Sequence, residues 1–146
     1  MIEESNESPL KAIAVANLQP TVDCLLVSCS DLVPIFEQLK LKSDESFLEE
    51  SAINQVQRSL KKQKSGQAAC YKFIFVDLDD PTLLPGRFMA SLNKMLESSD
   101  GVKMEVFACR SSSSDRILKM CKEHGMTFLP KPLTVDKLKA ALKKYL

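Results

Sequence analysis

The segment that decides the fold class of this 146-residue chain is residues 71–81, YKFIFVDLDDP. Its first six residues are mostly aromatic or β-branched, which is typical of a strand. The apolar residues run on without the alternation of a half-exposed strand, so both faces of this strand are predicted to be buried. Three aspartates and a proline follow at once, which places acidic side chains where the strand ends.

The same pattern extends in both directions along the chain. Further apolar strands are predicted over residues 22–28, 104–108 and 127–129, whereas residues 42–50 show little strand pattern. Between these segments, apolar residues recur at spacings of three and four, which predicts helices. The predicted helices lie over 31–41, around 53–60, after Pro85-Gly86, from Asp115 to about 124, and after Thr134. Ser114 and Thr134 are predicted to cap the last two helices, and Leu118 is predicted to face the core with Ile117 and Cys121. Alternating strands and helices predict a parallel sheet covered by helices on both faces.

One domain of about 126 residues accounts for this pattern. Residues 1–20 are predicted to be a tail or linker, in which 11–16 (KAIAVA) form an extra strand or the end of the linker, and 21–146 the folded domain. Twenty basic and nineteen acidic residues give a net charge of +1, which does not favour nucleic-acid binding. No apolar run is long enough to span a membrane, so no membrane contact is expected.

The cysteine and histidine content argues against several kinds of metal, disulfide and catalytic site. Five cysteines without a CxxC pair do not suit a zinc ribbon or a disulfide framework, and predict reduced thiols in a cytoplasmic or nuclear protein. A single histidine, His124, without a GxSxG motif, does not favour a serine hydrolase. The common glycine-rich nucleotide loops are also missing from the sequence.

In a parallel α/β sheet, ligands and chemistry gather at the carboxyl ends of the strands. The side chains at those ends are therefore the candidates for a functional site: Ser28, Cys29, Asp77, Asp79, Cys109, Arg110 and Lys131.

Two segments resemble the receiver (response-regulator) domain of two-component phosphorelay proteins. Residues 71–86, YKFIFVDLDDPTLLPG, are similar to the phospho-acceptor strand and loop, with Asp77 at the acceptor position. Residues 124–142, HGMTFLPKPLTVDKLKAAL, are similar to the end of the domain, with Lys131 at the lysine position and Phe128 at the switch aromatic. The resemblance covers about residues 22–146. It implies the strand order 2-1-3-4-5, a flavodoxin-like doubly wound sheet, and a cis peptide between Lys131 and Pro132.

The sequence departs from that family at two positions of the site. The resemblance places an acidic pair that holds Mg²⁺ where this chain has Ser28 and Cys29, and a threonine or serine where it has Cys109. Asp77 would remain a metal ligand, with Asp79 contributing through its backbone while its side chain points away. A hydroxyl and a thiol are poor ligands for Mg²⁺, so we expect its binding to be weak or absent.

These observations predict a degenerate receiver domain, as in hybrid histidine kinases or pseudo-response regulators. It would act in a phosphorelay mainly through protein–protein contacts, with weak or absent phosphorylation. The expected partner is a histidine phosphotransfer protein or a histidine kinase domain, docking on the helix near residues 31–41 and the Pro130–Pro132 loop. Two alternatives stay open: a working receiver in which Asp77 accepts phosphate, and a flavodoxin-like ligand or redox domain.

Overall fold

The computed structural model describes residues 22–67, 69–99 and 102–143. The predictions for residues 1–20, including the extra strand at 11–16, lie outside these residues. In the part of the chain that the structure describes, no helix is both long and apolar enough to cross a membrane.

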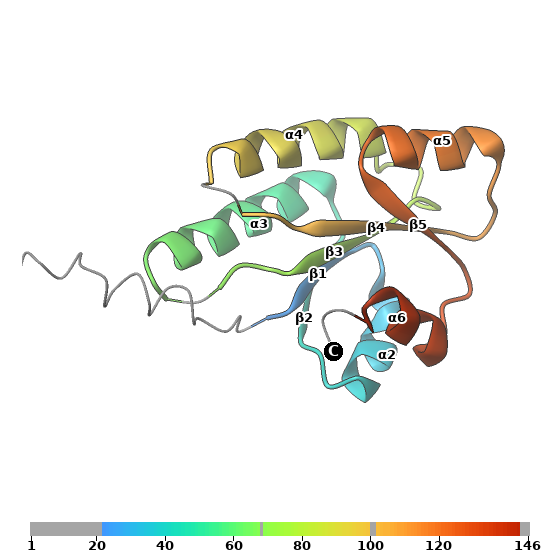
Figure 1. Cartoon of the computed structure of the whole chain (residues 1–146), viewed down its shortest axis with the longest axis horizontal. Coiled ribbons are helices and arrows are strands. Elements are labelled where there is room, and N and C mark those ends of the chain that lie inside the picture. The colour runs from blue at the N-terminus through green and yellow to red at the C-terminus, as the bar shows by residue number, and fades with distance from the viewer. Residues whose placement is uncertain (1–21, 68, 100–101, 144–146) are drawn as a thin grey trace, which may run out of the picture.

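A five-stranded parallel sheet forms the centre of the molecule (Figure 1). The order is β2-β1-β3-β4-β5, so the predicted order 2-1-3-4-5 is confirmed. The strands are β1 (Cys24–Val27), β2 (Ser43–Ser46), β3 (Phe73–Asp77), β4 (Glu105–Arg110) and β5 (Met126–Pro130). All four residues of β1 and the first four of β3 are buried, as their apolar runs predict.

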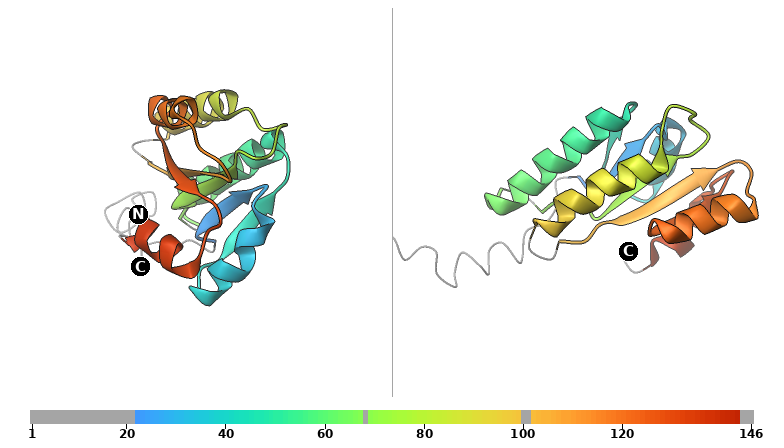
Figure 2. Two further views of the ribbon diagram at one scale, coloured as in Figure 1. Left: turned by 90° about the vertical axis from the view of Figure 1, so that its right-hand side faces the viewer. Right: turned by 90° about the horizontal axis from the view of Figure 1, so that it is seen from above.

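Helices cover both faces of this sheet (Figures 1 and 2). The helices α3 (Glu49–Lys64), α4 (Pro85–Glu97) and α5 (Asp115–Glu123) lie over one face. On the other face lie α2 (Val33–Gln38), which follows the 3₁₀ turn η2 (Ser30–Leu32), and α6 (Val135–Ala141). Ser114 and Thr134 cap α5 and α6 by accepting hydrogen bonds from the backbone N–H groups of Ile117 and Lys137, as the sequence indicates.

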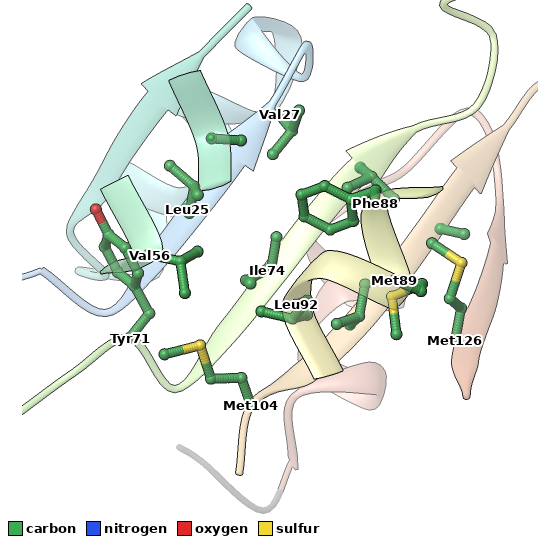
Figure 3. Close-up of a cluster of buried hydrophobic side chains, with 14 of the residues drawn as sticks. Leu25, Val27, Val56, Tyr71, Ile74, Phe88, Met89, Leu92, Met104 and Met126 are labelled. Carbon is green, nitrogen blue, oxygen red and sulfur yellow. The ribbon is translucent and has the colours of Figure 1, made fainter. Parts of the chain in front are cut away.

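Each face of the sheet has its own apolar core. The core under α3, α4 and α5 is mainly aliphatic side chains and methionines, and Figure 3 shows Leu25 of β1, Ile74 of β3 and Leu92 of α4 within it. The core under α2 and α6 is aromatic: Phe75 stacks on Phe107 with ring centroids 4.8 Å apart, and meets Phe36 edge-on at 5.3 Å. The covering of both faces leaves the strand ends as the place for a site.

Three local predictions differ from the structure. Residues Ser43–Ser46 form an edge strand although their sequence, SDES, has almost no strand character. The predicted helix over 31–41 is instead the η2 turn and the six-residue α2. Leu118, predicted to face the core, is 45% exposed, because α5 lies on the sheet through Ile117 and Cys121.

Candidate functional site

Asp77 is the last residue of β3, at the carboxyl edge of the sheet. Its neighbour across the β3–β4 ladder is Cys109, and β1 ends on its other side. The side chain is 13% exposed, so this carboxylate is accessible only from the edge of the sheet. The parallel register thus brings together the strand ends that the sequence singled out.

Lys131 forms an ion pair with Asp77. Its Nζ atom lies 2.7 Å from Asp77 Oδ2 and 3.1 Å from Asp79 Oδ2, so one ammonium bridges two carboxylates. The predicted cis peptide between Lys131 and Pro132 is also present. Burial opposes the charge on Lys131, but hydrogen bonds to the two aspartates outweigh it and raise the lysine pKa.

Asp79 was predicted to point away from the site, and this prediction is wrong. Its carboxylate accepts hydrogen bonds from Ser111 Oγ at 2.7 Å and from the Ser111 backbone N–H at 3.1 Å, besides the contact with Lys131. The Ser111 hydroxyl is the main reason that the pKa of Asp79 is lowered, with Lys131 contributing less. The backbone N–H of Asp79 also donates to Asp77 Oδ1 at 2.8 Å, which fixes the turn after β3.

Ser28 and Asp80 form a second polar contact at the same edge. Ser28 Oγ donates to Asp80 Oδ2 at 2.8 Å, and Ser28 adopts the left-handed backbone conformation with φ of 59°. Asp80 Oδ1 accepts from the Thr82 backbone N–H and hydroxyl. The Thr82 hydroxyl, followed by Ser28, lowers the pKa of Asp80, so this carboxylate is ionised at neutral pH.

Cys29 and Cys109 are buried beneath this edge, with 1% and 0% exposure. The Cys29 thiol donates to the Val27 carbonyl oxygen at 3.3 Å. The neighbouring Cys109 thiol and burial both raise the pKa of Cys29, which keeps it protonated. All five cysteines of the chain are described and all are free thiols. Cys29 and Cys109 therefore serve as small apolar residues of the aromatic core.

The donor atoms at this edge do not suit Mg²⁺, which prefers several carboxylate oxygens and water. Both oxygens of Asp77 already accept hydrogen bonds, from Lys131 and from Asp79 N–H. Ser28 is turned to Asp80, and Cys29 is a buried neutral thiol. Within the described ranges, no three His, Cys, Asp or Glu side chains are grouped so that they could hold a metal ion.

Phe128 lies in the middle of β5, where it is half-buried against the aliphatic core. The sequence did not indicate two contacts of the site: Asp79 with Ser111, and Asp80 with Ser28. The only signal for them was the unusual density of aspartates after β3, next to a serine-rich loop after β4. Their pairing depends on which loops the fold brings together.

Comparisons with known proteins find similarity at the level of structure. No protein-family model matches the chain, and no curated protein matches it. The receiver domain of the histidine kinase CKI1 from Arabidopsis thaliana, complexed with Mg²⁺, superposes with a TM-score of 0.67 at 17% identity, covering 88% of this chain and 94% of that one.

Two bacterial structures are similar in the same way. The signal receiver domain of a putative LuxO repressor protein from Vibrio parahaemolyticus gives a TM-score of 0.65 at 20% identity, covering 88% of this chain and 90% of that one. A chain of the CheX–CheY complex from Borrelia burgdorferi, solved with BeF₃ and Mg²⁺, gives 0.66 at 16% identity, covering 87% and 91%. With its five parallel strands in the order 2-1-3-4-5, this chain has the CheY-like receiver fold.

Proposed function

We propose that this chain is a degenerate receiver domain that acts in two-component signalling mainly by binding another protein, with weak or absent phosphorylation of Asp77. The proposal rests on the two residues that follow β1. The resemblance to receiver domains places an acidic pair there, and this chain has Ser28, which is hydrogen-bonded to Asp80, and Cys29, which is buried as a neutral thiol.

The chemistry of phosphoryl transfer supports this proposal. A carboxylate that attacks a phosphoryl group needs positive charge to offset the charge of both reactants. Lys131 supplies one such charge, but the ammonium is shared between Asp77 and Asp79. Without hard oxygen ligands beside Asp77, the stabilisation that a divalent cation provides is reduced or lost.

A working phospho-acceptor is the second candidate, and one observation favours it. The 2.7 Å pair of Lys131 and Asp77 keeps an accessible carboxylate next to a cation at the edge of the sheet. In this alternative, a histidine phosphotransfer partner would complete the site on docking.

Mg²⁺ titration followed by NMR distinguishes the two candidates. We expect no saturable shift of the Asp77 and Asp79 amides at sub-millimolar Mg²⁺, and no acid-labile adduct at Asp77 after incubation with acetyl phosphate and Mg²⁺. Asp77→Asn is the control for adduct formation. Saturable binding together with an adduct that disappears in Asp77→Asn would establish the working receiver instead.

The double variant Ser28→Asp, Cys29→Asp tests the assignment of the end of β1. Added carboxylates are expected to strengthen Mg²⁺ binding by about tenfold or more, because they supply the missing hard ligands. The variant is also expected to be less stable without metal, since Asp80 lies 2.8 Å from Ser28 Oγ and like charges repel. The measurement is the melting temperature with and without Mg²⁺. An unchanged response to Mg²⁺ in a folded variant would contradict the assignment.

The proposed docking face comprises α2 and the Pro130–Pro132 loop. Pro34 on α2 and Pro130 and Pro132 in the loop are exposed, and apolar residues of this kind anchor interfaces. We expect binding to a histidine phosphotransfer protein to persist in Asp77→Asn, because the contact needs a surface rather than a metal. Pro34→Glu should weaken it, whereas Lys139→Glu on the exposed side of α6 should not. Calorimetry or shift mapping measures both, and loss of binding in folded Asp77→Asn would contradict the proposal.

A further inference from the structure

Three hydrogen-bond donors converge at one point beside Asp77. The hydroxyl and the backbone N–H of Ser111 come from the loop between β4 and α5, and the Lys131 ammonium comes from the loop after β5. A cation, a hydroxyl and a main-chain N–H directed at one point form a set of donors that stabilises an oxyanion. The fold thus builds an oxyanion site from two separate loops.

The group at this point is the carboxylate of Asp79. Its Oδ2 atom lies 2.7 Å from Ser111 Oγ, 3.1 Å from Ser111 N and 3.1 Å from Lys131 Nζ, so one oxygen contacts all three donors. The backbone of Asp79 is held in turn by Asp77, whose Oδ1 accepts its N–H. Asp79 is therefore fixed at both its main chain and its side chain.

A negatively charged ligand from solution would have to displace this carboxylate. Asp79 belongs to the same chain as the three donors, so its carboxylate competes with free anions at a high effective concentration. An incoming anion would also meet Asp77 and Asp79 with only one ammonium between them, and like charges within a few ångströms oppose binding. Asp79 thus opposes the binding of phosphate-like anions in two ways: its carboxylate fills the site, and its charge repels them.

We propose that Asp79 is a built-in occupant of this oxyanion site, which holds the β4–α5 loop against Lys131 and excludes phosphate-like anions. The inference deepens the proposed function, on which its biological meaning rests: a loop fixed by the protein's own carboxylate needs no phosphoryl group to order it. The contacts of Asp79 with Ser111 and Lys131 require neither a partner protein nor a metal.

Titration with inorganic phosphate, followed through the Ser111 amide by NMR, tests this proposal. Wild-type protein is expected to show no saturable shift, whereas Asp79→Ala is expected to bind phosphate about tenfold more tightly or better. Two donors of Ser111 lose their partner in this variant, and Lys131 keeps Asp77 alone as a partner. Without phosphate, the Ser111 amide of Asp79→Ala should exchange with solvent faster, and added phosphate should slow it again.

Asp80→Ala is the matched control, since it removes a carboxylate from the same loop whose partners are Ser28 and Thr82. It should leave phosphate affinity close to that of wild type. Asp79→Gly also removes the carboxylate and its contacts with Ser111, and it serves as the test variant if Asp79→Ala does not fold. The proposal would be overturned by an equal gain in phosphate affinity in Asp80→Ala, or by no gain in phosphate affinity in a folded Asp79 variant.

The titration uses the isolated chain and does not involve phosphorylation of Asp77. A failure of the proposed function, such as a stable adduct at Asp77, would therefore be observed separately from a failure of this inference.

Discussion

Phe75→Ala is expected to lower the free energy of unfolding by about 3–5 kcal/mol. Phe75 is fully buried in the middle of β3, and its ring contacts Phe36, Phe73 and Phe107 at centroid distances between 4.8 and 5.9 Å. Truncation removes apolar burial and these ring contacts together, and it leaves a cavity that strands on both sides prevent from closing. Such a loss is a large fraction of the stability of a domain of this size.

Phe47→Ala is the matched control, because the same atoms are removed from a side chain that is 61% exposed. Its effect should stay within about 0.5 kcal/mol. Urea unfolding monitored by circular dichroism measures both variants, and comparable slopes against urea would show that the stabilities can be compared. A loss below about 1.5 kcal/mol in Phe75→Ala would mean that the aromatic core is not packed as described.

Lys131→Met is expected to lower the free energy of unfolding by about 1–3 kcal/mol at pH 7. The side chains of Lys131 and Asp77 are 19% and 13% exposed, so the pair is only weakly screened by solvent. Without the ammonium, Asp77 and Asp79 face each other's negative charge with no cation between them. Methionine retains most of the aliphatic stem, so the loss reports mainly on charge.

The effect of Lys131→Met should depend on pH in a defined direction. The pKa of Lys131 is raised in the folded state, so its contribution is complete below the unfolded value near 10.4 and is lost as the pH rises through the folded value. The pKa of Asp79 is lowered, so its contribution is present above the unfolded value near 3.9 and is lost as the pH falls through the folded value. The stability difference between wild type and variant should be greatest from about pH 5 to 9.5.

Arg87→Met is the control for this variant. Arg87 also pairs with a carboxylate, Glu49, at 2.6 Å, but its side chain is 61% exposed. Its removal should cost clearly less than the removal of Lys131, because solvent screens the pair. Equal losses of unfolding free energy in Lys131→Met and Arg87→Met would contradict the role given to the Lys131 bridge. A stability difference between wild type and Lys131→Met that is the same at pH 3 and pH 7 would contradict it as well.

Apolar patterning was sufficient to predict the buried strands and the capped helices. The run before Asp77 is buried on both faces, and Ser114 and Thr134 cap α5 and α6 as predicted. These features depend on residues within one segment, and burial of an apolar run is favoured wherever it lies. The resemblance then supplied the strand order and singled out Asp77 and Lys131, which the structure pairs.

The local sequence pattern was insufficient to predict elements that are stabilised by a neighbouring segment. The polar residues Ser43–Ser46 become a strand because β1 offers them a parallel hydrogen-bonding edge, from Cys24↔Ser43 to Val27↔Ser46. Strand propensity depends strongly on such context, and an edge strand needs no apolar side chains on its outer side. Periodicity likewise could not tell that α5 turns Leu118 to solvent.

The sequence by itself determined that acidic side chains follow a doubly buried strand and that a lysine precedes a proline near the last helix. It also shows Ser28 and Cys29 directly after the run of residues 22–27 that predicts the first strand. Only the tertiary structure decided where each carboxylate points. Asp79 reaches Ser111, 32 positions away, and Asp80 reaches Ser28, 52 positions away, because the parallel sheet brings the loops after β1, β3 and β4 to one edge. Hydrogen bonds between distant loops depend on distances that no local pattern encodes.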